Sequence, residues 1–423
     1  MKKLRVVLIG AGDRGKTYTN VMSKDREKFE MVAVAEPIEN RREYIKNLYN
    51  LPENMCFADY QPLFELGKIA DFAIIATMDR EHLEPTLKAI ELGYDILLEK
   101  PIAPTPDDCV KITDAANKKG VRVVICTVLR YTAVFKTLKS IIDSGRIGKV
   151  MSINHEECVG NVHQSHSFVR GNWGNSERSS NMLLQKSCHD MDILQWLLNK
   201  KCKSIQSFGA RSYFRMENAP AGSPDYCVQG CNIADTCPYN AVKLYYDDKQ
   251  NNWFRTAATK KMAPTDKDVL NAISNTQYGK CVYKCDNDVV DHQIVNMLFE
   301  DDTTVSFTMN AFNKGGRFIH LMGTLGEVHA ALDDNTPISL YDFQTKKEEI
   351  IPIVGKDGIT GGHGGGDEGI ISDLYEYFCG EYSGFSIPTI EESLYNHMLV
   401  FAAEESRKNN SVVDFNDYIK RYY

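Results

Sequence analysis

The sequence lacks an apolar run of the roughly 20 residues that cross a bilayer as a helix. Its first hydrophobic run, Val6 to Ile9, is also too short for the apolar core of a secretory signal, and it leads into glycines. These absences argue against a membrane-spanning or secreted protein. We therefore expect a soluble, cytoplasmic protein.

A large excess of one charge is missing as well. The 423 residues include 49 Lys and Arg against 57 Asp and Glu, a formal net charge of -8, and neither sign forms long blocks. The sequence thus offers no basic face for nucleic acid or for an anionic membrane surface. The expected partners are small molecules and further copies of the same chain.

Cysteine is present but dilute. Without a secretory signal, the 12 cysteines predict reduced thiols in place of a disulfide framework. Thiolates of Cys227, Cys231, Cys237 and Cys281, with Cys285 close by, could bind one structural zinc ion and clamp a segment that has little core of its own. Their spacing is not the common CxxC pair, so ordinary reduced thiols remain the leading alternative.

Strand and helix patterns alternate over the first third of the chain. Short β-branched runs lie at 4–10, 31–36, 71–77, 95–99 and 121–127. This alternation indicates βαβ units and a parallel sheet, and runs without polar alternation are typical of strands that helices cover on both faces. We predict an α/β domain over residues 1–127.

The remaining residues, 128–423, have a different character and predict an α+β domain. Helical spacing is found at 132–144, 182–200, 367–380 and 390–408, and strand-like patterns at 203–215, 289–299, 303–312 and 317–323. The stretch of about 216–287 is rich in Asn, Asp, Cys, Tyr and Gly and has weak periodicity. It therefore reads as an insertion.

Three glycines mark a dinucleotide site directly after the first strand. In Gly10-Ala11-Gly12-Asp13-Arg14-Gly15 the first glycine allows a tight turn. The second lets the backbone approach a pyrophosphate, and the third lets helix and strand pack closely. Residues 1–127 are therefore predicted to form a Rossmann domain.

The second strand ends at Glu36, 21 residues after Gly15. A carboxylate there accepts hydrogen bonds from ribose hydroxyls and repels a 2′-phosphate, which favours NAD over NADP. Arg41 and Arg42 follow closely and could hold the extra phosphate, so NADP stays open.

At Glu99-Lys100-Pro101 the sequence resembles the Gfo/Idh/MocA oxidoreductases, the family of glucose-fructose oxidoreductase and inositol dehydrogenase. Thr77, Asp79 and His82 resemble the family's loop after the third Rossmann strand, and GYDILLEKPIA and SGRIGKV extend the similarity over nearly the whole chain. By this resemblance Thr77, Asp79, His82, Glu99 and Lys100 line the cofactor site.

The resemblance implies a Rossmann domain followed by an α/β domain with a large, mainly antiparallel sheet. It also implies NAD or NADP in the first domain and a sugar or cyclitol between the domains. Homodimers or homotetramers that form through the open face of the sheet are a further implication.

Oxidation of a carbinol needs a base for the hydroxyl proton and a cation near the developing alkoxide. The resemblance assigns the cation to Lys100 and the acid/base role to His189, with Asp192 as a following acid. Gln185 stands where many members have Asp, and an amide cannot carry charge or raise the basicity of the histidine. Lys186 could contribute a second cation.

Further substrate residues are expected in two other segments and just after the first domain. Polar and aromatic side chains suit sugar hydroxyls and sugar faces. The candidates are Tyr131, His163, His166, Arg170, Trp173, His363 and Asp367. Segment 154–173 is expected to form one loop. A metal held by its clustered histidines is disfavoured because no carboxylate or thiol spacing completes a site. The glycine run before Asp367 could equally be a flexible linker.

The leading hypothesis is reversible hydride transfer between NAD and a carbinol carbon of a sugar, sugar derivative or cyclitol. The runner-up is a glycosidase that oxidises its substrate transiently, eliminates the aglycone and returns the hydride. A dinucleotide-binding sensor without turnover is a third possibility, against which the presence of both Lys100 and His189 argues.

Overall fold

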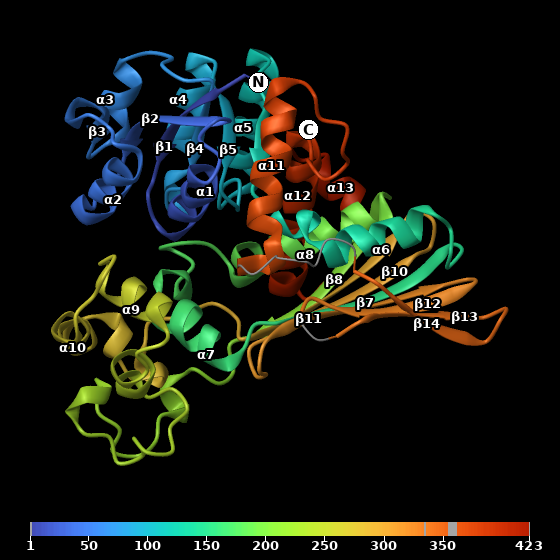
Figure 1. The fold of residues 1–423 in the computed structure, drawn as a ribbon. Coiled ribbons are helices and arrows are strands. Elements are labelled where there is room, and N and C mark those ends of the chain that lie inside the picture. Colours follow the sequence, from blue (N-terminus) through green and yellow to red (C-terminus); the bar gives the residue numbers. More distant parts are fainter. Residues whose placement is uncertain (1, 334–335, 354–361, 423) are drawn as a thin grey trace.

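The structure is a computed structural model that describes residues 2–333, 336–353 and 362–422, the side chains of residues 362 and 363 excepted. It contains two sheets, one of 6 strands and one of 9 (Figure 1).

The first sheet is wholly parallel, in the order β3-β2-β1-β4-β5-β6. Its strands are β1 (Leu4–Ile9), β2 (Phe29–Ala35), β3 (Cys56–Phe57), β4 (Phe72–Ile75), β5 (Asp95–Leu98) and β6 (Val123–Ile125). The predicted Rossmann fold is confirmed, and the short edge strand β3 is an addition to the predicted five.

Helices cover both faces of this sheet. Successive side chains along each strand point to opposite faces, and both sets are apolar and buried. Val6 and Leu8 belong to one apolar cluster, and Val7 and Ile9 to the other. The helices of this domain are α1 (Asp13–Ser23), α2 (Glu39–Tyr49), α3 (Tyr60–Glu65), α4 (Leu83–Leu92) and α5 (Pro106–Lys119). The distant helix α11 (Gly366–Cys379) joins them and lies beside α1 (Figure 1).

The second sheet has the order β14-β13-β12-β11-β7-β10-β9-β8-β15 and is antiparallel except between β7 and β10. Its strands are β7 (Val150–Cys158), β8 (Cys202–Ala210), β9 (His292–Phe299), β10 (Thr304–Asn310), β11 (Gly316–Gly323), β12 (Gly326–Ala331), β13 (Ile338–Asp342), β14 (Lys347–Ile351) and β15 (Val413–Asp414). The large, mainly antiparallel sheet that the resemblance implied is confirmed.

Among the described residues, helices pack on only one face of the second sheet. They are α6 (Ala133–Asp143), α8 (Met182–Leu198), α12 (Ile390–Asn409) and α13 (Phe415–Ile419) (Figure 1). Along β11, Ile319 and Leu321 point toward the helices and are buried, whereas Phe318 and His320 point to the other face. That second face is therefore open in the single chain.

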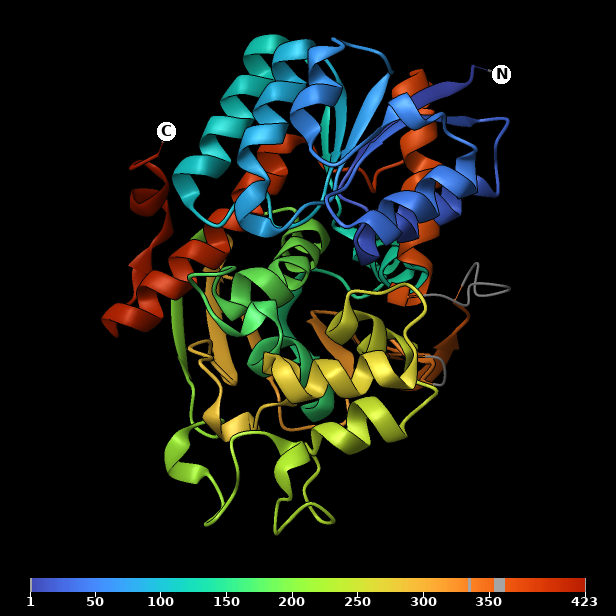
Figure 2. The same cartoon turned by 90° about the vertical axis from the view of Figure 1, so that its left-hand side faces the viewer.

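The insertion forms a lobe beside the second sheet and below the first domain (Figures 1 and 2). It contains helices α9 (Asn252–Thr259) and α10 (Asp266–Asn275), and it has apolar clusters of its own around Tyr245 and Phe214. The segment thus has little core of its own, as expected, and aromatic side chains supply that small core despite the weak periodicity.

Two other segments differ from the prediction. The segment that was expected as one loop, 154–173, continues β7, passes through α7 (Asn161–His163) and forms a π-helical turn over Gln164–Arg170. The strand predicted at 203–215 ends at Ala210. None of the helices that the structure describes is long and apolar enough to span a membrane.

Candidate active site

The glycine turn after β1 keeps the start of α1 open. A Cβ on Gly10, whose φ is +89°, would lie 2.5 Å from the Ala76 oxygen, and a Cβ on Gly15 would lie 2.1 Å from the Gly10 oxygen. Both glycines are thus needed for the fold. A Cβ on Gly12 would meet nothing closer than the Arg41 guanidinium at 3.7 Å, and α1 has no side-chain cap. The turn fits a dinucleotide pyrophosphate, which uses the free amides of a helix start.

Glu36 shapes this turn from the end of β2. Its carboxylate accepts hydrogen bonds from the amides of Ala11 at 2.6 Å and Ile38 at 2.9 Å. Each oxygen keeps a second lone pair for a ribose hydroxyl. Arg42 donates to the main-chain oxygen of Glu36 at 2.6 Å, whereas the Arg41 guanidinium lies over the glycine turn.

Arg14 and Asp367 bind each other, although the sequence suggested cofactor and substrate roles for them. Two guanidinium nitrogens of Arg14 lie 2.5 and 3.2 Å from the Asp367 carboxylate at the start of α11, and a third lies 2.8 Å from Glu99. Tyr18 donates to the same Glu99 oxygen at 2.5 Å. Arg14 therefore ties the glycine loop to β5 and to the C-terminal region, while Asp13 beside it is exposed.

The turn that carries Lys100 is braced by buried polar groups. The carboxylate of Glu99 accepts from the Lys100 amide at 2.9 Å, and the peptide bond to Pro101 is cis. Burial opposes ionisation of Glu99, but the charges of Arg14 and Lys100 hold its pKa below the usual value.

His82 braces the other side of the same turn. Its Nδ1 donates to the Pro101 oxygen at 2.7 Å, and its Nε2 lies 3.3 Å from the Thr77 oxygen. His82 and Thr77 therefore position the turn, and the Thr77 hydroxyl donates to the Glu81 oxygen at 3.1 Å.

A chain of hydrogen bonds links Lys100 to a carboxylate of the first domain. The Lys100 ammonium donates to the main-chain and side-chain oxygens of Gln185 at 2.7 and 2.8 Å. The Gln185 amide donates to Asp79 at 2.5 Å, and Asp79 also accepts from the Ser179 hydroxyl at 2.5 Å. Gln185 occupies the position of the Asp in the family motif, and it is hydrogen-bonded to the carboxylate of Asp79. A carboxylate is therefore still present, one hydrogen bond further from Lys100.

His189 lies one helical turn after Gln185 on α8, so the two side chains share a face of the helix. His189 is buried. Across from that face, the Lys100 ammonium lies 5.7 Å from the centre of the Trp173 ring. The structure thus brings together Lys100, Gln185 and Trp173 between the two domains, and His189 follows Gln185 on the same face of α8.

A buried network of charges lies next to this group on the inner face of the second sheet. Lys186 pairs with Glu157 at 3.1 Å, and Arg317 contacts Glu157 at 2.5 Å and Asp190 at 2.9 Å. His155 binds Asp190 through Nε2 at 2.9 Å. Burial lowers the pKa of Lys186, and the Glu157 carboxylate counters this.

The members of this network on β7 were not predicted from the sequence. Because β7 places alternate residues on one face, His155 and Glu157 occupy positions where apolar side chains are usual. His155 and Glu157 lie two positions apart, so they point to the same face of a strand. Two ionisable residues on a face that is otherwise apolar could have indicated a buried charge network.

His163 borders this site through Phe168, whose ring centre lies 5.8 Å from that of His163 and 5.7 Å from that of Trp173, whereas His166 packs in the insertion. Burial lowers the pKa of His163, and the nearby charges of Lys186 and Lys100 lower it further. His166 is stacked on Phe254 of the insertion with ring centres 4.0 Å apart. It also bonds the Tyr245 hydroxyl at 2.8 Å, and burial lowers its pKa to about 3. His166 is a core residue, contrary to the expectation of substrate contact.

Three other predicted substrate residues also serve the interior. Asp192 is fully buried and accepts two hydrogen bonds from Arg130, each 2.7 Å long. Tyr131 packs in the apolar cluster beneath α11. Arg170 donates to the main-chain oxygens of Lys280 at 2.8 Å and Tyr239 at 2.7 Å, which fastens the insertion. The side chain of His363 lies outside the described residues.

The zinc site predicted from the cysteines is not supported. Within the described part of the chain, no three cysteine sulfurs approach one another closely enough to bind one ion. A small apolar hollow is lined by Cys227, Cys237 and Cys281. The Arg170 guanidinium lies beside it, 3.8 Å from the Cys227 sulfur. A fixed cation beside the thiols disfavours a second one, and burial raises the pKa of Cys237 and Cys281, which favours neutral thiols.

Comparisons with known proteins agree with this architecture. A family profile described as "Oxidoreductase family, NAD-binding Rossmann fold" matches residues 4–127, and one described as "GFO/IDH/MocA C-terminal domain" matches residues 135–229. Together the two profiles match just over half of the chain.

Individual relatives are distant. YteT of Bacillus subtilis (strain 168), which bears the name of an oxidoreductase, is 23% identical over 319 residues, 72% of each protein. An inositol 2-dehydrogenase of Klebsiella pneumoniae is 30% identical over 207 residues, which span 48% of this chain and 57% of that enzyme.

A solved scyllo-inositol dehydrogenase of Lactobacillus casei, with bound NAD(H) and scyllo-inositol, superposes with a TM-score of 0.66. The superposition covers 98% of this chain and 100% of the enzyme at 14% identity. At that identity the likeness shows a shared fold.

Proposed function

The chain belongs to the Gfo/Idh/MocA family of oxidoreductases, and on that premise we propose that it transfers a hydride between NAD and a carbinol carbon of a cyclitol or sugar. The observation that carries the proposal is the anchoring of the Lys100 ammonium by Gln185 at the boundary of the two domains. The names of the inositol 2-dehydrogenase relatives favour a cyclitol among the possible substrates.

The residue at the end of β2, Glu36, favours NAD over NADP as the cofactor. Glu36 keeps its carboxylate at the end of β2, where a 2′-phosphate would meet negative charge. Arg41 lies over the glycine turn and is the residue that would receive such a phosphate instead. Titration of the protein with NADH and NADPH, followed by cofactor fluorescence, tests the choice. Tighter binding of NADPH would contradict it.

Lys100 and His189 divide the proton and charge chemistry. Bound NAD would accept the hydride in the oxidation direction. Lys100 Nζ donates two hydrogen bonds to Gln185, which leaves its third proton to bind the substrate oxygen and stabilise developing negative charge there. The His189 imidazole is suited to take the hydroxyl proton, since an imidazole nitrogen can act as a general base toward a positioned hydroxyl.

The surroundings of Lys100 favour a polyhydroxylated substrate. Trp173 offers an aromatic face beside the ammonium, and Lys186 and His163 offer polar atoms on the side of the second sheet. Burial keeps His163 neutral, so one of its ring nitrogens can accept a hydroxyl hydrogen bond.

The direct test is incubation with NAD and a panel of cyclitols, free sugars and aryl glycosides, with NADH absorbance and aglycone release followed in parallel. We expect NADH to accumulate with at least one cyclitol or free sugar. Aglycone release without NADH would replace the proposal by the redox-neutral glycosidase. Cofactor binding without either product would replace it by the sensor.

We further propose a homodimer or homotetramer that forms through the open face of the second sheet. Phe208, Ile294, Phe318 and Ile350 are exposed large apolar side chains on that face. Covering them would remove apolar surface from water. Light scattering on the eluting protein should give a multiple of 47.8 kDa, and Phe318→Asp should reduce it. A monomeric native protein would contradict this assembly.

A further inference from the structure

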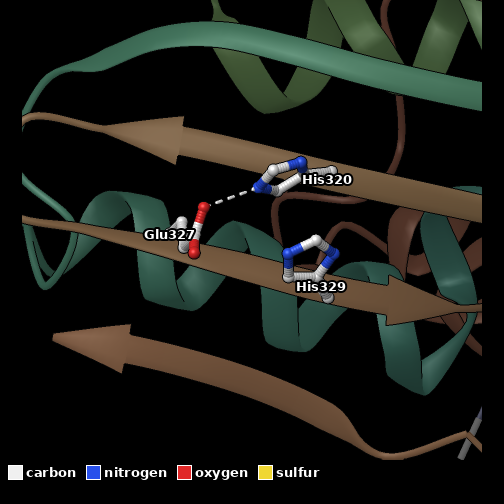
Figure 3. Close-up of side chains that lie close together, drawn as sticks. All are labelled: His320, Glu327 and His329. Atoms are coloured by element: carbon white, nitrogen blue, oxygen red, sulfur yellow. Dashed lines mark hydrogen bonds and ion pairs between the residues drawn. The ribbon is translucent and has the colours of Figure 1, made fainter. Parts of the chain in front are cut away.

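The open face of the second sheet carries a group of three side chains that the proposed reaction does not use. His320 lies on β11, and Glu327 and His329 lie on β12 (Figure 3). Within the described residues this is the one group of three or more His, Cys, Asp or Glu side chains whose ligand atoms all lie within 4.8 Å of one another.

The register of the sheet brings these side chains together. His320 and His329 are direct partners in the antiparallel pair of β11 and β12, so they share a face. Glu327 lies two residues before His329 on the same strand and therefore points the same way. Three potential metal ligands are thus held on two hydrogen-bonded strands. Strands hold side chains more rigidly than a loop does.

The side chains already contact one another. The His320 Nε2 lies 2.9 Å from a Glu327 carboxylate oxygen, and the two imidazole rings are stacked with centres 3.8 Å apart (Figure 3). Two imidazoles and a carboxylate are a ligand set that zinc uses in sites that keep one open position. Oxygen-seeking ions such as Mg²⁺ and Ca²⁺ are disfavoured by the two nitrogen donors.

The group also borders a hollow of about 420 Å³ on the same face. Asn154 and Glu156 of the neighbouring strand β7 line it together with His320 and His329. Asn154 is the direct partner of His320 on β7 and points to the same side. An ion bound here would therefore have a further side-chain oxygen within reach.

We propose that His320, Glu327 and His329 form a binding site for Zn²⁺ or a similar imidazole-preferring divalent ion, separate from the active site. Stacked rings direct their lone pairs along parallel lines. The imidazoles must therefore rotate about χ2, a soft torsion, to converge on one ion. Binding would replace the ring stacking and join β11 to β12 through the metal.

The test is titration of the chelator-treated, reduced protein with Zn²⁺, followed by calorimetry, with Co²⁺ as a spectroscopic probe. We expect one equivalent to bind natively and at least 10-fold more weakly to His320→Ala and to His329→Ala. His292→Ala is the matched control, because His292 pairs with Asp291 at 2.8 Å on the same sheet without a second imidazole.

Two further measurements distinguish this site from zinc binding by the free cysteines. Co²⁺ bound by imidazole and carboxylate lacks the thiolate charge-transfer absorbance that binding to the free cysteines would produce. Glu327→Gln, which preserves the shape of the side chain, should also weaken binding. Equal binding by the native protein and both histidine variants, or a cobalt spectrum dominated by thiolate, would overturn the proposal.

Discussion

The Lys100 ammonium is held by two oxygens of one residue, the main-chain and side-chain oxygens of Gln185. Replacement by Met preserves much of the length and removes the charge. We expect Lys100→Met to lower turnover at least about 100-fold, the usual scale for a positioned catalytic group. NADH binding, measured by fluorescence, should change little.

Lys203→Met is the control for this substitution, because Lys203 is an exposed lysine on β8. It should retain native activity. Native turnover by Lys100→Met would remove Lys100 from the mechanism.

Gln185 links Lys100 to Asp79, so its side chain is predicted to position the lysine. Gln185→Leu removes both side-chain bonds and leaves only the main-chain acceptor. We expect kcat to fall by roughly 10-fold or more, since hydrogen bonds to charged groups contribute about 1.5–3 kcal/mol.

Gln185→Glu is the informative comparison, because it restores an acceptor for Lys100 but places a carboxylate against Asp79. Its pH–rate profile should differ from that of the native protein as the two carboxylates compete for a proton. A Gln185→Leu variant with native kcat and pH profile would show that the main-chain oxygen alone suffices.

At the residue scale the sequence motifs identified Lys100, His189 and Gln185, but not the contact between Gln185 and Asp79. These two residues are 106 positions apart and belong to different domains. The patterns in a single sequence indicate local periodicity and turns. They do not indicate which residues contact each other at such a distance along the chain.

The insertion is the element whose internal structure was least evident from the sequence. Its core depends on His166, a neutral histidine stacked on Phe254, with a pKa lowered by burial to about 3 from a usual value of 6.5. The folded state therefore holds fewer protons on this residue than the unfolded state between about pH 6.5 and 3. Stability contributed by His166 is present above that range and is lost as pH falls through it.

We expect His166→Phe, which keeps an aromatic ring on Phe254, to flatten this acid dependence. The difference in slope should approach about 1.4 kcal/mol per pH unit within the window. Thermal unfolding midpoints from pH 7 to 4 measure it, with His292→Phe, at a half-buried position on β9, as the control. Parallel pH profiles for native protein and His166→Phe would contradict the buried, neutral state.

Element prediction succeeded where the apolar spacing was regular and failed where buried polar groups interrupted it. The helix predicted at 182–200 is Met182–Leu198, and the glycine turn, β1 and α1 follow the expected order. By contrast, β7 was read in part as a loop because His155 and Glu157 occupy its inner face. The ion pairs that satisfy those groups come from α8 and β11, which the local sequence does not specify.

At the scale of the whole molecule, Arg14 connects the two ends of the chain. It binds Glu99 at the end of β5 and Asp367 at the start of α11, 353 positions away. Both carboxylates are buried. Arg14→Met would remove this counter-charge from both carboxylates, and we expect the free energy of unfolding to fall by about 3 kcal/mol, the usual cost of removing one partner of a buried ion pair.

Thermal unfolding should report this loss as a midpoint several degrees lower. Arg26→Met serves as the control, because Arg26 makes exposed contacts near α1. An Arg14→Met variant as stable as the native protein would show that Arg14 is not needed to compensate the two carboxylates.

The proposed function depends on the passage of a hydride between the cofactor and a carbinol carbon at the Lys100–His189 site. A cyclitol or sugar that carries deuterium on its carbinol carbon makes this transfer visible by mass spectrometry of the reduced cofactor. We predict that the native protein places the deuterium on the nicotinamide ring, and that Lys100→Met does so at least about 100-fold more slowly. Reduced cofactor without deuterium, or equal rates for the two proteins, would contradict the account.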